Sequence, residues 1–147
     1  MSVTVRPAKL EDLPALLAIE QAATTAAHWP AEQYSTRLAE GHILLAENEV
    51  SVCGFICARV AAGEWEIENI VVAEGQRRRG AGEELLRALI ATSRDAGGVA
   101  VLLEVRESNV AARRLYEKHG FRVSGRRRQY YREPSEDAVL YELVVVP

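Results

Sequence analysis

The chain has few of the residues that cross-link a protein or bind a metal. Among its 147 residues are two cysteines, three histidines and one methionine. Cys53 and Cys57 would lie about 13 Å apart on a strand, which is too far for a disulfide. We therefore expect both to be small buried hydrophobic residues. The histidines, at positions 28, 42 and 119, do not have the spacing of metal ligands, so no metal site is expected.

Long apolar runs and an excess of positive charge are also missing. No run approaches the roughly 18 apolar residues of a membrane span, and the first residues lack the apolar segment of a signal peptide. We expect a cytoplasmic protein without membrane contact. The net charge of -3 argues against a nucleic-acid-binding domain. Two arginine triplets, Arg77–Arg79 and Arg126–Arg128, indicate discrete contacts with anions instead.

The composition that is present is that of an ordinary globular protein. Hydrophobic residues make up 48% and charged residues 27% of the chain, close to the averages for folded domains. A chain of this length typically buries about 68–70% of its unfolded surface, which is enough for one core. Since we find no internal repeat and no linker, residues 1–147 are expected to form a single domain.

The hydrophobic pattern predicts strands alternating with helices, an α/β (α+β) arrangement. Strands are expected at residues 3–6, 43–47, 50–61, 64–72, 99–105, 122–125 and 139–144, and helices at 9–23, 31–41, 80–96 and 110–119. A polar segment holding Tyr130 and Tyr131 is expected to join the last two strands. The order strand, helix, strand between residues 64 and 105 indicates a parallel pair with a right-handed crossover.

A basic, glycine-containing loop, Arg77–Gly82, follows the apolar run Ile70–Val72 and opens a helix. At a helix N-terminus several backbone N–H groups have no partner within the helix, and the helix dipole adds partial positive charge. A phosphate is the natural ligand there, and the arginines suit a multiply phosphorylated one. The alternative is a simple turn with solvated arginines.

Three further polar residues are expected near that loop. Sheets of this kind bind ligands outside the carboxyl ends of their parallel strands, here Val72 and Val105. Glu104 ends an apolar strand, so its carboxylate must be functional, protonated or paired, the last as an ion pair with a nearby arginine. Asn109 is expected to cap the next helix. Tyr116 on that helix is either functional or a core aromatic residue.

These motifs resemble the GNAT superfamily of acetyl-CoA-dependent N-acetyltransferases. The resemblance lies in the order of strand, Arg-x-x-Gly-x-Gly at 77–82, helix and strand, followed by Asn-x-x-Ala-x-x-Leu-Tyr-Glu-x-x-Gly-Phe at 109–121. It extends over essentially the whole chain and implies a mixed sheet of about seven strands with a splayed parallel pair, flanked by about four helices. Four segments are similar to the RimI branch, whose members acetylate the N-terminal alanine of a small-subunit ribosomal protein: 69–72, 103–109, 115–118 and 127–131.

The resemblance implies roles for these residues in an acetyl transfer. Acetyl-CoA would be the donor, with no metal, and the transfer would be direct, within a ternary complex. Glu104 would act as the general base, and Tyr116 would give a proton to the leaving thiolate. The residues that the resemblance assigns to acetyl-CoA are Ile70, Val71, Val72, Arg77, Arg78, Arg79, Gly80, Ala81, Gly82 and Asn109.

The acceptor that the resemblance implies is a protein or peptide N-terminus. Glu68, Tyr130 and Tyr131 would line its groove, no nucleic acid would be contacted directly, and the enzyme would be a monomer or weak dimer. Solvation explains Glu68 and packing explains the tyrosines equally well, while Trp29 either lines the same groove or packs in the core. Two other functions stay open: an enzyme that acetylates a small-molecule amine or a lysine side chain, and a non-catalytic acetyl-CoA-binding module.

Overall fold

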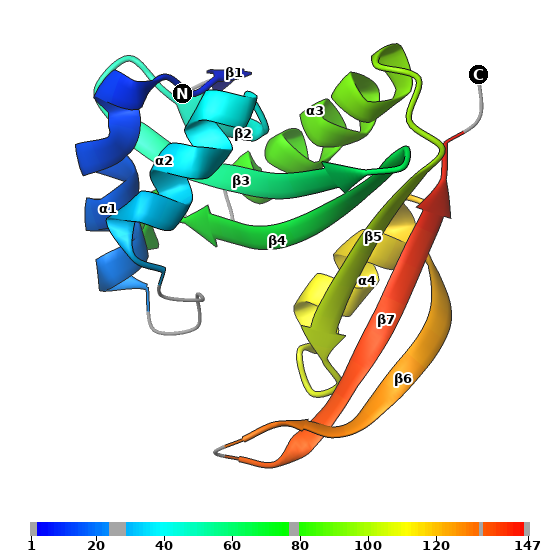
Figure 1. Cartoon of the computed structure of the whole chain (residues 1–147). Helices are drawn as coiled ribbons and strands as arrows, with labels where there is room; N and C mark the ends of the chain where they lie inside the picture. The colour runs from blue at the N-terminus through cyan, green and yellow to red at the C-terminus, as the bar shows by residue number, and fades with distance from the viewer. Residues whose placement is uncertain (1–2, 24–28, 77–79, 133, 146–147) are drawn as a thin grey trace.

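A computed structural model describes residues 3–23, 29–76, 80–132 and 134–145. These residues form a mixed sheet of seven strands in the order β1-β2-β3-β4-β5-β7-β6 (Figure 1). The strands are β1 (Thr4–Pro7), β2 (Ile43–Glu47), β3 (Val52–Ala61), β4 (Glu64–Val72), β5 (Ala100–Arg106), β6 (Arg122–Tyr131) and β7 (Glu136–Val144). The helices are η1 (Leu10–Asp12), α1 (Leu13–Ala22), α2 (Ala31–Glu40), η2 (Glu74–Gln76), α3 (Ala81–Asp95) and α4 (Val110–Lys118), of which η1 and η2 are short 3-10 turns.

The last two strands are longer than expected and form a hairpin. β6 continues to Tyr131, through the segment that we expected to be a polar connection, and β7 begins at Glu136. The arginine-rich run hides the strand pattern because β6 is an edge strand, and nearly all of its residues are exposed. The predicted connection is therefore wrong, and both Tyr130 and Tyr131 lie in a strand.

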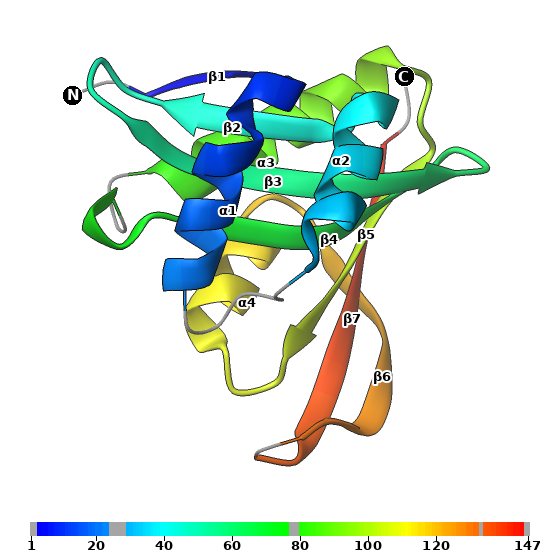
Figure 2. The same cartoon turned by 60° about the vertical axis from the view of Figure 1, so that its left-hand side comes forward.

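Helices cover the sheet on two faces. α1 and α2 lie on one face, and α3 and α4 lie on the opposite face (Figure 1, Figure 2). Each face has its own apolar cluster, with Leu16, Tyr34 and Phe55 among the buried residues of the first and Leu85 and Val101 among those of the second. Within the described ranges, none of the helices has the length and hydrophobicity needed to cross a membrane.

β4 and β5 are the parallel pair, and they separate part-way along their length. Their pairing runs only from Glu64 and Ala100 to Glu66 and Leu102. Beyond these residues β4 continues beside β3 to Val72, while β5 continues beside β7, and the two ribbons diverge (Figure 1). The predicted mixed sheet with a splayed parallel pair is confirmed.

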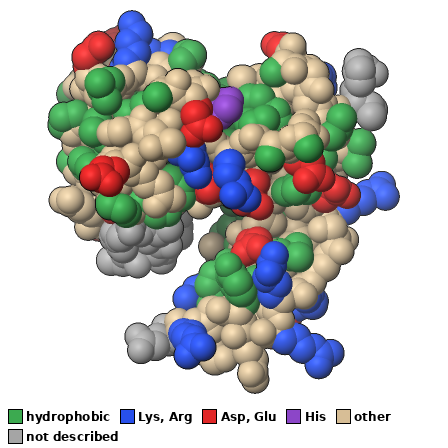
Figure 3. Space-filling model, in the orientation of Figure 1, with side chains coloured by type: hydrophobic (Ala, Val, Ile, Leu, Met, Phe, Trp, Pro, Cys, Tyr) green, Lys and Arg blue, Asp and Glu red, His purple; other side chains and the backbone are tan. Residues whose placement is uncertain are grey.

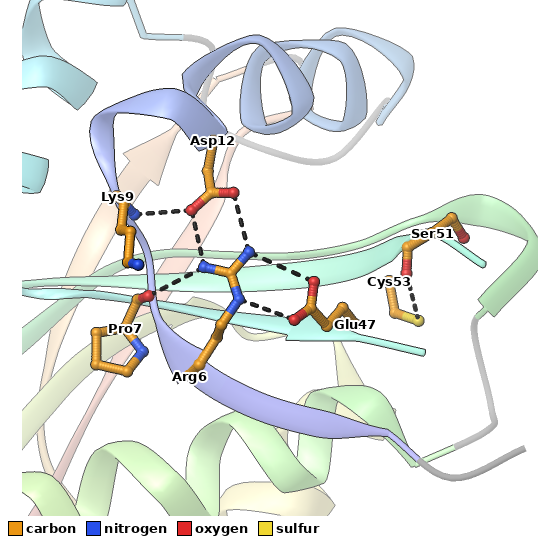
Figure 4. A network of polar contacts seen from close by, with 7 residues as sticks. All are labelled: Arg6, Pro7, Lys9, Asp12, Glu47, Ser51 and Cys53. Carbon is orange, nitrogen blue, oxygen red and sulfur yellow. Dashed lines mark hydrogen bonds and ion pairs between the residues drawn. The ribbon is translucent and has the colours of Figure 1, made fainter. Parts of the chain in front are cut away.

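An arginine in β1 fastens the turn before α1 to the sheet (Figure 4). Arg6 donates hydrogen bonds of 2.9 and 3.0 Å to the carboxylate of Asp12, and one of 2.8 Å to Glu47 of β2. The backbone N–H of Lys9 donates to the same Asp12 carboxylate at 2.7 Å. The guanidinium holds the pKa of Asp12 below its usual value. These bonds fix the point at which α1 begins.

A polar network is buried beneath α1 and α2. Glu20, Tyr34 and Asn69 are only 2%, 0% and 7% exposed. The Tyr34 hydroxyl accepts a hydrogen bond of 3.0 Å from the amide of Asn69 and is itself bonded to Glu20, which also accepts the backbone N–H of Trp29 at 3.0 Å. Burial and the neighbouring carboxylate raise the pKa of Tyr34 well above its usual value, so its hydroxyl stays protonated. The network joins both helices to the part of β4 that has left β5.

A second polar cluster joins α3 to α4. Glu83, in the first turn of α3, lies 2.8 Å from Nζ of Lys118 and 2.7 Å from Nε2 of His119, at the end of α4. Hydrogen bonds with these two residues lower the pKa of Glu83 to about 2. The cluster therefore holds the start of α3 against the end of α4.

We expect Tyr34→Phe to lower the free energy of unfolding by about 1–3 kcal/mol, because Glu20 and Asn69 each lose a buried partner. Urea denaturation at neutral pH measures the change. Tyr130→Phe is the matched control, since Tyr130 is 50% exposed and loss of its hydroxyl should cost less than about 0.5 kcal/mol. Equal values for the two variants would show that the buried hydroxyl does not stabilise the fold.

Glu83→Gln should lower the Tm by a few degrees at neutral pH, and its difference from the wild type should shrink in acid. A carboxyl whose pKa is lower in the folded chain stabilises the fold above its unfolded value of 4.5, and this stabilisation is lost as the pH falls toward about 2. Calorimetry across this pH range measures both variants. Glu84→Gln is the control, because Glu84 contacts Arg87 of its own helix at 2.8 Å and should have a smaller effect. A difference that does not vary with pH would contradict the assignment.

Candidate active site

The start of α3 lies against the end of β4. Gly80 is the N-cap of α3, with a φ of 87° that favours glycine, and it offers no capping side chain. A methyl group added to Gly82 would lie 3.5 Å from the side chain of Val72, so the loop packs closely on the strand. The N–H groups of this first turn are suited to bind an anion. Of the predicted cofactor loop, Gly80, Ala81 and Gly82 are placed, whereas residues 77–79 lie outside the described part of the chain.

The predicted cofactor segment Ile70–Val72 lies on β4 beyond its last pair with β5. A pocket of about 210 Å³ opens beside this end of the strand, between it and α1. Its walls are almost entirely apolar and include Ile19, Ala22 and Val72. Sequence analysis did not find this pocket, because it depends on how α1 packs across the sheet.

α4 carries two of the predicted residues. Asn109 caps this helix, with its side-chain oxygen accepting the N–H of Ala112 at 3.2 Å, as predicted. Tyr116 is 6% exposed and packs in the core, with its ring centroid 5.8 Å from that of Phe121 and 6.0 Å from that of Tyr141. Burial, with a smaller contribution from a neighbouring tyrosine, raises the pKa of Tyr116 to about 12. Its phenol is therefore protonated throughout the physiological range.

Glu104 points to the opposite face of β5. Side chains alternate along a strand, and Leu103 and Val105 pack in the core that contains Tyr116. Glu104 therefore faces the other side, beyond the last residue of β5 that pairs with β4. Its side chain is 29% exposed, and Oε1 lies 3.0 Å from Nε of Arg127. The ion pair with a nearby arginine, one of the alternatives for Glu104, is present in the structure.

Two tyrosines and two arginines gather next to Glu104. The ring centroids of Tyr130 and Tyr131 are 5.2 Å apart. The guanidinium of Arg127 lies 5.5 Å from the ring centre of Tyr130, and that of Arg106 lies 4.4 Å from the ring centre of Tyr131. Burial and the charge of Glu104 raise the pKa of Tyr131. The structure thus places Tyr131 near the carboxylate, and Tyr130 beside Tyr131 and Arg127.

Glu68 and Trp29 are tied to α2. The Glu68 carboxylate binds Arg37 through two hydrogen bonds, of 2.7 and 3.2 Å, and both side chains are about 15% exposed or less. Its charge is therefore largely neutralised within the protein, which weakens the prediction that it attracts a cationic peptide. The indole of Trp29 packs on Tyr34 with ring centroids 5.0 Å apart, as expected of a residue at the edge of the core.

The second arginine triplet contacts anions within the protein. Arg126 lies 2.7 Å from Glu107, and Arg127 pairs with Glu104. Sequence analysis recognised the triplet but assigned it no partner. Lys and Arg side chains gather around the end of the β6–β7 hairpin (Figure 3). In the described ranges no group of three or more His, Cys, Asp and Glu side chains could hold a metal ion.

Known proteins share this sequence pattern and this geometry. Residues 11–121 match the acetyltransferase (GNAT) family. The chain is 34% identical over 146 residues to the ribosomal protein bS18-alanine N-acetyltransferase of Escherichia coli K12, with 97% of both chains covered. It is 29% identical over 145 residues to an L-methionine sulfoximine/L-methionine sulfone acetyltransferase of Pseudomonas aeruginosa, covering 85% of this chain and 83% of the relative.

The fold agrees with these relatives. The crystal structure of the Escherichia coli ribosomal-protein-S18-alanine N-acetyltransferase matches with a TM-score of 0.90 and 31% identity, covering 99% of this chain and 96% of that one. The family match spans most of the chain, and the Escherichia coli sequence is similar over nearly its whole length. The chain is therefore an acyltransferase that uses acetyl-CoA, and it belongs to the acetyltransferase (GNAT) family.

Proposed function

We propose that this enzyme acetylates the N-terminal α-amine of a protein that begins with alanine, a small-subunit ribosomal protein being the expected substrate. The observation that carries the proposal is the position of Glu104. This carboxylate lies where β5 has left β4, on the face opposite the buried phenol of Tyr116 and beside Tyr130 and Tyr131. The similarity to an enzyme named for a ribosomal protein alanine supports the choice of acceptor.

The chemistry of an α-amine suits a single carboxylate base. An α-amino group with a pKa near 7.7 is roughly 15–20% neutral at pH 7, whereas a lysine is only about 0.04% neutral. Glu104 therefore has to remove a proton only from the α-ammonium group of the acceptor, which loses this proton readily near neutral pH. The neutral amine then attacks the thioester carbonyl, its nitrogen gives up the remaining extra proton to water, and the thiolate of CoA departs as the C–S bond breaks.

Tyr116 is the proposed proton donor to that thiolate. With its pKa raised to about 12, complete transfer of its proton to a thiolate of pKa near 8.5 would be uphill by about 5 kcal/mol. The proposed role is therefore a hydrogen bond to sulfur that shortens as the bond to carbon breaks. The phenol keeps its proton, and the departed thiolate takes one from water.

No cysteine offers an acetyl-enzyme route within the described residues. Cys53 and Cys57 are free and buried, as predicted, and burial raises the pKa of the Cys57 thiol to about 12. Such a thiol is a poor nucleophile at neutral pH. Direct transfer in a ternary complex is therefore the proposed mechanism, with Ile70–Val72, the loop that ends at Gly82 and Asn109 as the proposed cofactor contacts. We expect a cytoplasmic monomer or weak dimer.

A small-molecule amine is the second candidate acceptor. The Pseudomonas aeruginosa relative is named for acetylation of methionine sulfoximine and methionine sulfone, so this scaffold also occurs with small acceptors. The exposed ring of Tyr130 favours a chain-like acceptor that can lie along it over a small one. A non-catalytic binding module would need neither Glu104 nor Tyr116.

A panel of acceptors tests the proposed function. Short peptides that differ only in residue one, polyamines and free amino acids are assayed by release of CoA. We expect the alanine peptide to give the highest kcat/KM, and Glu104→Gln to lower its kcat by about 10²-fold while the KM for acetyl-CoA stays nearly unchanged. An N-acetylated alanine peptide is the blank. Activity confined to small amines would exclude the protein acceptor.

Tyr116→Phe should lower kcat by about 10²-fold and leave the KM for acetyl-CoA nearly unchanged. Because its pKa is about 12, Tyr116 keeps its proton well above pH 9, so the wild-type kcat should not fall between about pH 9 and pH 10.5 through this group. Steady-state rates across that range measure both effects. Tyr34→Phe, which removes a buried hydroxyl from the other face, controls for general destabilisation. Wild-type turnover in Tyr116→Phe would leave Tyr116 with a packing role alone.

A further inference from the structure

Arg127 crosses a strand to reach Glu104. β7 lies between β6 and β5, with Arg127 opposite Ala138 and Glu104 opposite Leu140. Ala138 and Leu140 are two residues apart and so lie on the same face of the sheet. The arginine side chain passes over β7, where the small side chain of Ala138 leaves room, and ends 3.0 Å from the carboxylate. The pair thus spans three strands of the hairpin region.

A bulge in β6 begins directly after Arg127 and turns Tyr130 toward it. Opposite Asp137, residues 128–130 of β6 take the place of one. Gln129 has a φ of 49°, rare for a residue other than glycine, and its N–H donates to the Asp137 carboxylate at 3.0 Å. In a regular strand Arg127 and Tyr130 would face opposite sides, yet here the guanidinium lies 5.5 Å from the ring centre. Bulges beside active sites redirect side chains in this way.

Arg127 therefore contacts both Glu104 and Tyr130. While it pairs with Glu104, it competes with the acceptor amine for the carboxylate. At pH 7 roughly 80–85% of an α-amine is protonated, so the acceptor usually arrives as a cation. The carboxylate of Glu104 is the group that has to receive this cation. The guanidinium already sits there, and two cations on one carboxylate repel each other. The guanidinium also lies 5.5 Å from the ring centre of Tyr130, and this cation–π contact can hold it on the hairpin when it leaves the carboxylate.

We propose that Arg127 is a specificity-determining residue, which covers Glu104 in the free enzyme and gives up the carboxylate only to an acceptor amine that carries a positive charge. The exchange replaces one cation by another on the carboxylate, so that the charge of Glu104 stays compensated. A neutral molecule cannot make this exchange without leaving Glu104 uncompensated. The inference rests on the proposed function, because it takes Glu104 as the group that receives the amine.

The exposure of the Arg127–Glu104 ion pair determines how strongly it weakens acceptor binding. The side chains of Arg127 and Glu104 are 56% and 29% exposed, and ion pairs this accessible to water are weak. Displacing the guanidinium should therefore weaken acceptor binding by only about 2- to 5-fold. A loss of affinity of this size discriminates among acceptors without blocking turnover.

Arg127→Gln tests the inference, with Arg126→Gln as the matched control. Both variants remove one positive charge from β6, but Arg126 pairs with Glu107 at 2.7 Å and not with Glu104. At saturating acetyl-CoA, we expect Arg127→Gln to lower the KM for an alanine-first peptide by about 2- to 5-fold with kcat unchanged. Arg126→Gln should keep the wild-type KM. Arg127→Lys keeps a cation within reach of Glu104 and should restore it.

Two results would overturn the inference. A higher KM in Arg127→Gln would show that Arg127 binds the acceptor, and an equal KM in all four proteins would show that Arg127 does not compete with it. A wild-type enzyme that acetylates no peptide contradicts the proposed acceptor instead. In that case the same four proteins are compared on the small amine that the enzyme does acetylate, so the two failures are distinguishable.

Discussion

The hydrogen bonding between β4 and β5 ends after three residue pairs, and the arrangement of the site depends on this ending. Each strand keeps its partner on the other side, since β4 stays with β3 and β5 with β7, so the sheet remains one body. Beyond the last pair, β4 and β5 are no longer hydrogen-bonded to each other, and groups on the two faces of the sheet can approach one another between them. In the proposed mechanism, a donor held by the loop before α3 and an acceptor arriving from the opposite face meet at this point.

The two faces offer different environments to the two substrates. On the α4 side, Tyr116 is 6% exposed and its pKa is raised, which suits a group that donates a hydrogen bond without ionising. On the other side, Glu104 is in contact with water and with a cation. Polar links hold each half in place: Glu20 and Tyr34 join α1 and α2 to β4, and Glu83 joins α3 to α4. The geometry of transfer thus relies on contacts made away from the reacting atoms.

The sequence predicted the features that short-range patterns determine. The Asn109 cap, the glycine at the start of α3 and the parallel pair all follow from residues close together in the chain. The predicted strand at residues 122–125 is shorter than β6, because an exposed edge strand lacks the apolar alternation that marks a buried one. The partner of Glu104 could be predicted only as an arginine, not as Arg127. That contact depends on the position of β7 between β5 and β6, which no local pattern specifies.

The ion pair between Glu104 and Arg127 also bears on how the product leaves. Acetylation converts a cationic amine into a neutral amide, so the product no longer competes for the carboxylate. In the proposed mechanism, the partly exposed Glu104 passes the proton it has taken to water, and its restored charge attracts the guanidinium again. On our proposal, the return of Arg127 to Glu104 favours departure of the amide. The contact that weakens binding of the acceptor would then also favour release of the product, and a weak, solvent-accessible ion pair suits this exchange better than a buried one.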